Sequence, residues 1–459
     1  MNEDPSLKGE HSDFAEMLWE RGTRIEREII DSIKRDREVM AITGPAGPAT
    51  FAATFKLMKE GADWIYQGVL LDGDKIGRPD LLQKALGRSK LGDHFYIPCD
   101  IKSGRATVDK DSDDIKSHYA NQMLFYCDLL ESVQGSRPDV ARIIDAAGEV
   151  TEFEVSEYDG PYQESKQQIE GIVYGSEQPE PVIGGICKEC VWSKVCLDWA
   201  NSCSDMTLLY KLGKQKFALK DRGVRTIADV AGMAVARFAA GPDKIPRAGA
   251  KTLEAWKRRA NVWQAGKPVI HTPPQFRNAP LVVYYDIEDD PSIDHVYLHG
   301  LIELAAGQRR PYHYFLAPVR ADEERAAREM WNYLSELPEG AVIYHYGSYE
   351  KTKLAGLARK YGLPTEILDK FDRLRVDLYR TVEQSSDWPV SSYGIKPIAK
   401  HLGFKWTAED ASGANSIAWY AEYQADPSNK KDVLGKILTY NREDCEAMIV
   451  VKDFLAREH

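Results

Sequence analysis

The first regular pattern along the chain is a stripe of apolar residues with helical spacing. The stripe consists of Phe14, Met17, Leu18, Ile25, Ile29 and Ile33. This spacing predicts a helix from Asp13 to about Asp36. A second long helix is expected to start near Ser112, because Asp113 and Asp114 would then lie in its first turn, where acidic residues are favoured.

Between and beyond these helices, the pattern changes to short apolar or alternating runs that are typical of strands. In the first half of the chain they are residues 64–72, 75–82, 94–102, 140–147 and 150–157. A Pro-rich hinge at 271–280 precedes further strand candidates at 281–289, 296–304 and 341–346. Helices are expected to fill most of 206–270 and most of the remaining C-terminal residues. The pattern therefore predicts an α/β protein with a helical middle.

Composition narrows the class of protein. The chain has 459 residues and a net charge of −11, which disfavours a broad basic surface that coats DNA. No stretch approaches the roughly 20 apolar residues of a membrane span, and the first residues are polar and acidic, unlike a signal peptide. We therefore expect a cytoplasmic protein of several domains, with no membrane partner.

Residues 94–102 place charged side chains inside a strand. Because side chains alternate in a strand, Phe95, Ile97, Cys99 and Ile101 share one apolar face, and Asp100 and Lys102 lie together on the other. This arrangement has two interpretations. It is either a surface ion pair, or a nuclease site in which the acid holds a divalent metal and the lysine positions or deprotonates water.

Four other residues favour the nuclease interpretation. Asp80 is expected at the end of a neighbouring strand, Glu26 borders the apolar stripe of the first helix, and Gln122 and Tyr126 share a helix face. With Asp100 and Lys102, this ordered set resembles the RecB-type branch of the PD-(D/E)xK nucleases over about residues 14–205. The resemblance implies a restriction-endonuclease-like core, with Mg²⁺ or Mn²⁺ bound by Asp80 and Asp100 and supported by Glu26. It further implies that Lys102 orients water, and that Gln122 and Tyr126 brace the site or touch nucleic acid.

A cluster of cysteines follows this region. Cys187, Cys190, Cys196 and Cys203 lie close together in a large chain without a signal peptide, which favours a metal over disulfides. Zinc and an iron–sulfur cluster are both compatible with the spacing. RecB-type nucleases, including the CRISPR-associated adaptation nuclease, often hold a [4Fe–4S] cluster with three such cysteines and a fourth near the N-terminus.

The N-terminal ligand of those relatives has no counterpart here, because no cysteine precedes Cys99. Either Cys203 replaces the missing ligand, or the cluster is incomplete, or the protein begins further upstream. The resemblance favours iron–sulfur over zinc.

The segment after the cysteines has the outline of a helix-hairpin-helix. A turn near Gly213 leads into one helix, and Gly223 leads to a second helix that starts at about Thr226. Lys214, Lys216 and Lys220 lie in this segment. They are compatible with phosphate binding, and equally with a solvated basic helix pair that packs two domains together.

A second acidic constellation lies in the C-terminal part. Asp286 and Glu288 are two apart in a strand, and Tyr440 and Asp444 are four apart in a helix, so each pair shares a face. With Glu350 between them, these residues resemble the RNase H-like DEDD exonucleases over about residues 280–459. The resemblance implies two metal ions bound by the acids and a tyrosine that positions water.

One position departs from that family, because Glu350 stands where an aspartate is usual. The longer side chain lengthens the reach to the metal, or Asp377 takes over its role.

Together the segments resemble predicted RecB-family nucleases with a C-terminal RNase H-like domain. We expect a nuclease domain at 1–180, the cysteine cluster at 181–205, the helical region at 206–270 and an RNase H-like exonuclease domain at 271–459. The expected function is metal-dependent cleavage of nucleic acid, most specifically by a DNA exonuclease in repair, recombination or mobile-element defence, with a helicase or defence-system protein as a further partner. The alternatives are that only one module is active and the other is a docking platform, or that the protein is a non-catalytic nucleic-acid-binding adaptor.

Overall fold

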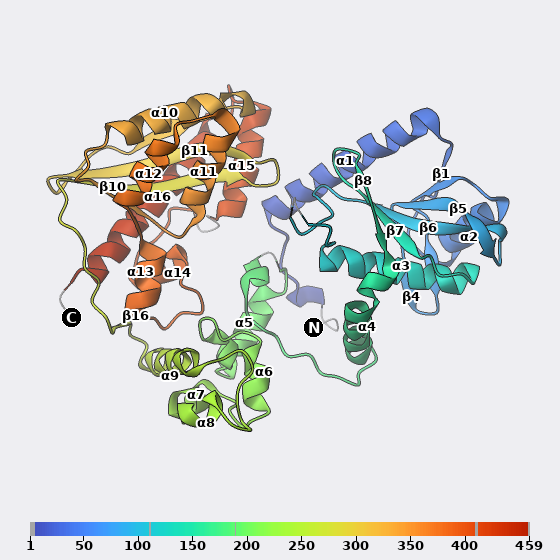
Figure 1. Ribbon diagram of the computed structural model, residues 1–459, viewed down its shortest axis with the longest axis horizontal. Coiled ribbons are helices and arrows are strands. Elements are labelled where there is room, and N and C mark those ends of the chain that lie inside the picture. The colour runs from blue at the N-terminus through green and yellow to red at the C-terminus, as the bar shows by residue number, and fades with distance from the viewer. Residues whose placement is uncertain (1–4, 110–111, 189, 409–411, 458–459) are drawn as a thin grey trace. The chain divides into compact units, whose positions relative to one another are not determined.

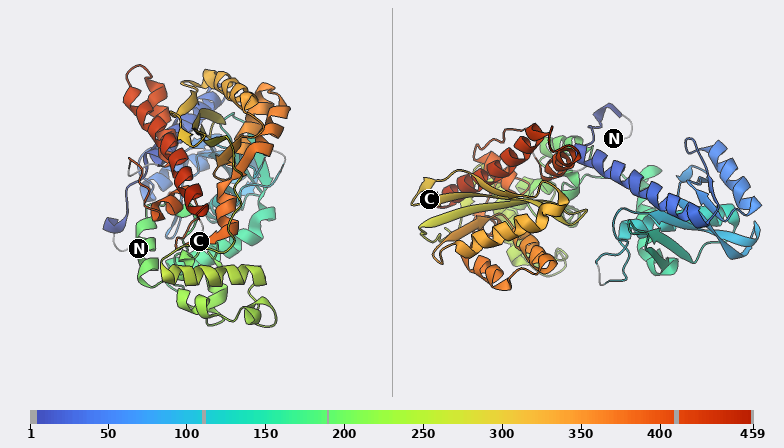
Figure 2. Two further views of the ribbon diagram at one scale, coloured as in Figure 1. Left: turned by 90° about the vertical axis from the view of Figure 1, so that its left-hand side faces the viewer. Right: turned by 90° about the horizontal axis from the view of Figure 1, so that it is seen from above.

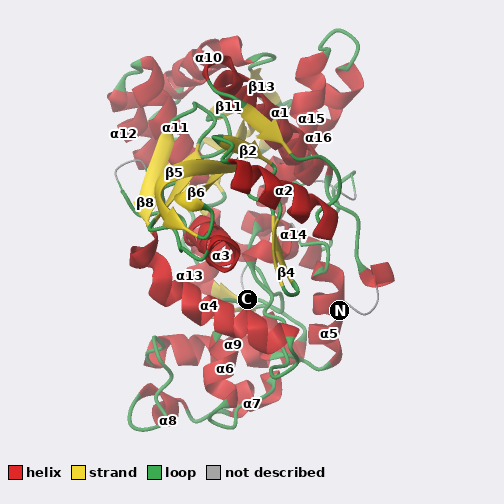
Figure 3. Cartoon of the chain, turned by 90° about the vertical axis from the view of Figure 1, so that its right-hand side faces the viewer, coloured by secondary structure: helices red, strands yellow, loops and turns green. Residues whose placement is uncertain are grey.

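The computed structural model describes residues 5–109, 112–188, 190–408 and 412–457 (Figure 1). The chain is a mixture of helices and strands, as Figure 3 shows. It divides into two compact units. One is Glu16–Glu180, and the other is Pro181–His459 together with the N-terminal segment up to Ala15. Within the described residues, none of the helices is long and apolar enough to cross a membrane.

The first unit is built on one mixed sheet with the strand order β1-β2-β5-β6-β7-β8. These strands are β1 Val39–Ala41, β2 Trp64–Tyr66, β5 Leu81–Ser89, β6 Gly92–Ile101, β7 Val140–Ile144 and β8 Val150–Glu154. β5 and β6 form an antiparallel hairpin, whereas β7 is parallel to β6. The helix α3, Ser117–Gln134, makes the crossover that a parallel pair requires.

Helices cover both faces of this sheet. The remaining elements of the unit are α1 Asp13–Asp36, α2 Pro48–Glu60, the hairpin β3 Leu70–Asp72 and β4 Lys75–Gly77, the short helix η2 Val155–Tyr158, and α4 Asp159–Val173. The predicted apolar face of β6 packs with the isoleucines of α1, and Tyr96 on its other face packs with Leu129 and Leu130 of α3. β6 is therefore buried on both sides, and the face that carries Asp100 is not a solvated surface.

Three predicted elements in this unit differ from the structure. The strand expected at 64–72 is broken at Gln67, whose φ of 56° is incompatible with an extended strand. Residues 75–82 likewise divide between β4 and β5, and Asp80 precedes β5 instead of ending a strand. The long helix starts at Ser117 rather than near Ser112, so Asp113 and Asp114 precede it, in a segment where Thr107 pairs with Ile115.

The second unit contains the cysteines and the helical middle. Its elements up to the C-terminal sheet are η1 Pro5–Leu7, η3 Gly185–Lys188, α5 Ser193–Ser202, η4 Met206–Leu208, α6 Gln215–Lys220, α7 Ile227–Gly232, α8 Val235–Ala239, α9 Ala250–Ala265 and β9 Val269–Ile270. The two helices expected around Gly223 are thus α6 and α7, and Thr226 caps α7 as its side chain accepts from the Asp229 amide. The N-terminal segment joins this region through the Gly9 amide, which donates to the Val191 carbonyl at 2.9 Å.

The C-terminal sheet has the order β12-β11-β10-β14-β15, with β13 also paired to β11. Its strands are β10 Leu281–Asp290, β11 His295–Ala305, β12 Gln308–Arg309, β13 His313–Leu316, β14 Val342–His345 and β15 Arg375–Asp377. β10, β11 and β13 are antiparallel neighbours, whereas β14 and β15 continue the sheet in parallel with β10. The three strands predicted in this region correspond to β10, β11 and β14.

Helices cover the two faces of this sheet in separate groups, which the right-hand view of Figure 2 shows above and below the yellow strands. On one face lie α10 Glu323–Glu336, α11 Tyr349–Tyr361 and α12 Thr365–Leu374. On the other lie α13 Leu378–Ser385, α14 Ile395–His401, α15 Gly413–Ala425 and α16 Lys431–Leu455. Alternation along β10 directs Val283, Tyr285 and Ile287 into the first group, so Asp286 and Glu288 point toward the second.

Candidate active sites

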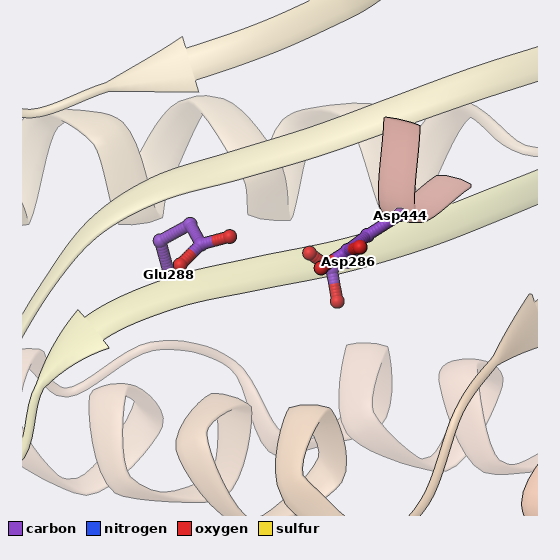
Figure 4. Close-up of side chains that lie close together, drawn as sticks. All are labelled: Asp286, Glu288 and Asp444. Carbon is purple, nitrogen blue, oxygen red and sulfur yellow. The ribbon is translucent and has the colours of Figure 1, made fainter. Parts of the chain in front are cut away.

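Three carboxylates from two elements meet in the C-terminal sheet. Asp286 and Glu288 come from β10, and Asp444 comes from α16 (Figure 4). One oxygen of each lies within 4.8 Å of the others. Within the described ranges, this triad is the only group of three or more His, Cys, Asp and Glu residues that comes together so closely. A cavity of ≈ 260 Å³ opens at the triad and is also lined by Tyr440 and Tyr349.

Burial and mutual repulsion disfavour the ionised forms of the three carboxylates. Burial, followed by the charge of Asp444, raises the pKa of Glu288 to about 8. The same two causes raise the pKa of Asp286 well above its usual range, and burial raises that of Asp444 to about 6. A cation among the three oxygens would relieve this repulsion. The carboxylate donor set suits a hard divalent ion such as Mg²⁺ or Mn²⁺.

Three neighbours that the sequence patterns did not single out hold the carboxylates in place, two of them directly and one through another. The Asn441 side-chain amide donates to Asp286 at 2.7 Å, and the Tyr312 hydroxyl donates to the Asn441 oxygen at 2.7 Å. The Trp406 indole donates to Asp444 at 2.7 Å. Asn441 could have been found from its position three residues before Asp444 on the same helix face. Trp406 had no such local signal.

The structure places the other predicted residues of this constellation at different distances from the triad. Tyr440 lines the triad cavity and its hydroxyl donates to Asp444. Glu350 is buried in the first turn of α11, 3.3 Å from the His345 ring, and lies outside the compact triad, although its charge contributes to the raised pKa of Asp286. Asp377 instead accepts from the backbone amides of Gly347 and Arg380 and caps α13.

Comparison with known families gives one finding. Residues 283–456 match the model of the RNase H superfamily. The C-terminal part of the chain is thus an RNase H-like domain, and the match supports a nuclease-like function that acts on nucleic acid. The triad lies inside the matched residues. Neither the curated proteins nor the solved structures gave a match.

In the first unit, the structure brings Asp80, Asp100 and Lys102 together. The Ile101 amide donates to Asp80 at 2.8 Å, and the Asp80 amide donates to Asp100 at 3.1 Å. The Lys102 ammonium donates to Asp100 and, at 2.9 Å, to the Gln122 oxygen. Because Asp100 is only 2% exposed, this is not the solvated ion pair of the simpler interpretation.

Hydrogen bonds extend this network to the remaining predicted residues. The Gln122 amide donates to the Tyr126 hydroxyl at 2.8 Å. On the opposite side, the Gln67 amide donates to Glu26 at 2.7 Å and to Asp80 at 3.1 Å. All six predicted residues are thus joined in one network. Gln67 was missed because its segment reads as a continuous strand, and only the break in the fold turns its side chain toward the acids.

The electrostatics of this network also fit a cation. Burial, followed by the negative charge of Asp100, raises the pKa of Asp80 to about 8. Two carboxylates at this separation are hard to ionise together unless positive charge lies beside them. Lys102 supplies part of that charge, and a divalent ion bound by the two carboxylates would supply the rest.

The cysteines are only partly gathered. Burial, followed by the charges of Cys190 and Cys187, raises the pKa of the Cys196 thiol, so the three thiols are electrostatic neighbours, although their sulfur atoms do not all lie within 4.8 Å of one another. Cys203 is exposed, and its thiol lies 3.8 Å from the Ala200 carbonyl. Three thiolates from one short segment fit the donor set of an iron–sulfur cluster or of zinc.

The lysines of the helical middle have different environments. Lys216 is fully buried and donates to the Pro181 carbonyl and to Asp205, which is also buried. Lys220 lies 3.8 Å from the same aspartate. The interpretation of these lysines as a phosphate-binding cluster is therefore wrong for Lys216, which serves as a buried counter-ion. Lys214 is exposed.

Proposed function

We propose that this protein is a metal-dependent nuclease with two separate acidic sites, and most specifically a DNA exonuclease. The observation that carries the proposal is the Asp286–Glu288–Asp444 triad, which lies within an RNase H-like domain. A divalent metal held there would polarise the attacking water and offset the negative charge that develops on the phosphate. Tyr440, whose hydroxyl donates to Asp444, would position that water.

We infer a second site of the PD-(D/E)xK type in the first unit. Its support is the hydrogen-bonded set of Asp80, Asp100 and Lys102 at one end of the β5–β6 hairpin, with Glu26 joined through Gln67. Asp80 and Asp100 would hold the metal, and Lys102 would stabilise charge on the phosphate. Gln122 and Tyr126 brace Lys102 from α3.

The preference for strand ends and for DNA rests on two arguments. The cavity at the triad is small, ≈ 260 Å³, which suits the end of a strand better than a continuous duplex. DNA is preferred because of the resemblance of the first unit to RecB-type nucleases. Repair, recombination or mobile-element defence, with a helicase or a defence-system protein as partner, are the settings that this resemblance favours.

Cleavage by the full chain and its variants tests both sites. We expect the parent to release nucleotides from end-labelled single-stranded DNA in Mg²⁺ or Mn²⁺ and to leave circular DNA intact. Lys102→Ala and Asp286→Asn should each remove the activity of one site, by about a hundredfold or more, because each removes a group that stabilises charge or holds the metal. The double variant should be inactive. Lys56→Ala and Asp432→Asn, at exposed positions, are the matched controls.

The other outcomes identify the alternatives. If one single variant is as inactive as the double variant, only that module is catalytic and the other is a docking platform. If the parent cleaves neither DNA nor RNA but binds them, the protein is an adaptor. Mn²⁺ should also raise the melting temperature by mass action, and Asp286→Asn should reduce that gain.

We further propose that Cys187, Cys190 and Cys196 hold an iron–sulfur cluster, with Cys203 as the fourth ligand. The support is the shared environment of the first three thiols and the closeness of Cys203 in sequence. Movement of Cys203 from its exposed position would be needed for it to join them.

Anaerobically purified protein should be brown and should contain iron and sulfide. Cys203→Ala should lower the iron content as much as Cys190→Ala, whereas Cys127→Ala, in a separate buried core, should leave it unchanged. Retention of the cluster in Cys203→Ala would assign the fourth ligand elsewhere, and stoichiometric zinc in colourless protein would exclude iron–sulfur.

A further inference from the structure

The segment SSYGIKPIAKHLGF contains a lysine that has no role in the proposed sites. This residue is Lys396, the second residue of α14, and it is half-buried. Its ammonium lies 4.4 Å from the centre of the Tyr440 ring and 5.7 Å from that of Trp406. Both aromatic side chains donate to Asp444. The fold therefore brings a cation from α14 to the edge of the triad.

Burial and the neighbouring carboxylates act on the Lys396 ammonium in opposite directions. The positive charge of Lys396 favours the ionised forms of Glu288 and Asp444, and so it acts to lower the pKa of each carboxyl against the effect of burial. Burial lowers the pKa of Lys396 itself, and the negative charges of Asp444 and Glu288 act against this effect. The faces of two aromatic rings add favourable contacts with a cation.

Glu350, the fourth acid of the constellation, lies beside a histidine and outside the triad. Glu350 is within 3.3 Å of the His345 ring, which is fully buried at the end of β14 and also contacts Arg375. The compact group in the described residues contains three carboxylates and not Glu350. One divalent ion could therefore be held by the three carboxylates, whereas a second ion would have to share them with the first, because Glu350 lies beside His345.

We propose that the C-terminal site works with a single divalent ion held by Asp286, Glu288 and Asp444, and that Lys396 is a further catalytic residue that contacts the scissile phosphate. Lys396 would supply the positive charge that a second ion supplies in two-metal nucleases. This inference rests on the proposed nuclease function of the RNase H-like domain.

The reaction balances without a change in the charge of the lysine. A water oxygen forms a bond to phosphorus, and the phosphorus–oxygen bond to the neighbouring nucleotide breaks. The water loses a proton to solvent, and the departing alkoxide takes one up. Lys396 remains an ammonium throughout and offsets charge on the phosphate oxygens, as lysines do in other phosphate sites.

The test uses the full chain with Lys102→Ala as the background, so that only the C-terminal site contributes to cleavage. Lys396→Met and Lys396→Arg are compared with Asp286→Asn. For each variant, calorimetric titration gives the affinity for Mn²⁺ and the number of ions bound. The rate of cleavage of end-labelled single-stranded DNA and the melting temperature in EDTA are also measured. Methionine keeps the length of the apolar stem, and arginine keeps the charge.

We expect Lys396→Met to lower the cleavage rate about a hundredfold, the effect of losing one group that stabilises the transition state. Mn²⁺ should bind this variant more tightly, because a positive neighbour that repels the ion is gone. Lys396→Arg should keep part of the activity. Asp286→Asn should lose one Mn²⁺ per chain, and no variant should gain a second ion at this site.

Three results would overturn the inference. The first is that Lys396→Met cleaves as fast as the background. The second is that this variant binds Mn²⁺ more weakly and also melts at a lower temperature. The third is that Asp286→Asn loses two Mn²⁺ ions. The second result would mean that the lysine only supports the fold. If Asp286→Asn cleaves as fast as the background, the proposed nuclease function of this domain fails as well, which distinguishes the two failures.

Discussion

At the scale of single residues, the C-terminal site contains contacts so close that one added methyl group would displace a side chain that holds the triad. Gly300 on β11 pairs directly with Asp286 on β10. A Cβ atom at Gly300 would lie 1.7 Å from the Asn441 side-chain oxygen and 2.4 Å from the Tyr312 hydroxyl. Both of these side chains belong to the hydrogen-bond chain that holds Asp286. The glycine therefore provides the space in which Asn441 can reach the acid.

This contact predicts the effect of Gly300→Ala. The methyl group should displace Asn441, destabilise the fold by about 1–3 kcal/mol as overpacking does, and weaken Mn²⁺ binding through Asp286. Denaturant unfolding and titration with Mn²⁺ measure the two effects.

Gly435→Ala is the control for this prediction. Gly435 is exposed in α16, and a Cβ there would contact nothing within 4 Å. Alanine should stabilise that helix by about 1 kcal/mol and leave Mn²⁺ binding unchanged. Equal effects of the two substitutions would show that Asn441 has no part in holding Asp286.

At the scale of elements, buried charges join the helical middle to the C-terminal sheet domain. Asp387, 2% exposed in β16 (Ser386–Asp387), accepts from Arg258 at 2.8 Å and from Arg259 at 3.2 Å, both on α9. Tyr210 stacks on Tyr393, with ring centres 3.9 Å apart. These contacts favour the view that the basic helices pack two parts of the chain together.

We predict that Asp387→Asn lowers the free energy of unfolding by about 3 kcal/mol, because the buried Arg259 then keeps its charge without a counter-ion. Chemical denaturation of the full chain, followed at tryptophan residues, measures this loss. Glu339→Gln breaks an exposed pair with Arg373 and should cost less than about 1 kcal/mol. A similar small loss in Asp387→Asn would show that the aromatic contacts alone hold α9.

At the scale of the whole molecule, each compact unit has its own sheet and its own acidic site. The network of Asp80 and Asp100 lies in Glu16–Glu180, and the triad lies beyond Pro181. Each site is assembled entirely within its own unit. The first combines one end of the β5–β6 hairpin with side chains of α1 and α3, and the second combines a strand with a helix. Substitutions in the two sites should therefore be separable, which is the basis of the comparison of single and double variants.

The sequence predicted those features that depend on neighbouring residues in the chain. The side-chain period of two in a strand places Asp286 beside Glu288, and Asp100 on the face opposite Cys99, wherever the strand is packed. The helical period likewise places Tyr440 and Asp444 on one face. These relations hold because backbone geometry alone fixes them.

Tertiary structure alone decided which distant groups meet and how strongly they are buried. Lys396, Trp406 and Tyr312 reach the triad from separate elements, and Gln67 reaches Glu26 only because the chain turns between β2 and β3. The burial of Lys216 and the late start of α3 also depend on contacts far along the chain. Such proximity arises from packing between elements, and the resulting burial sets the electrostatics of each site, so neither could be read from local spacing.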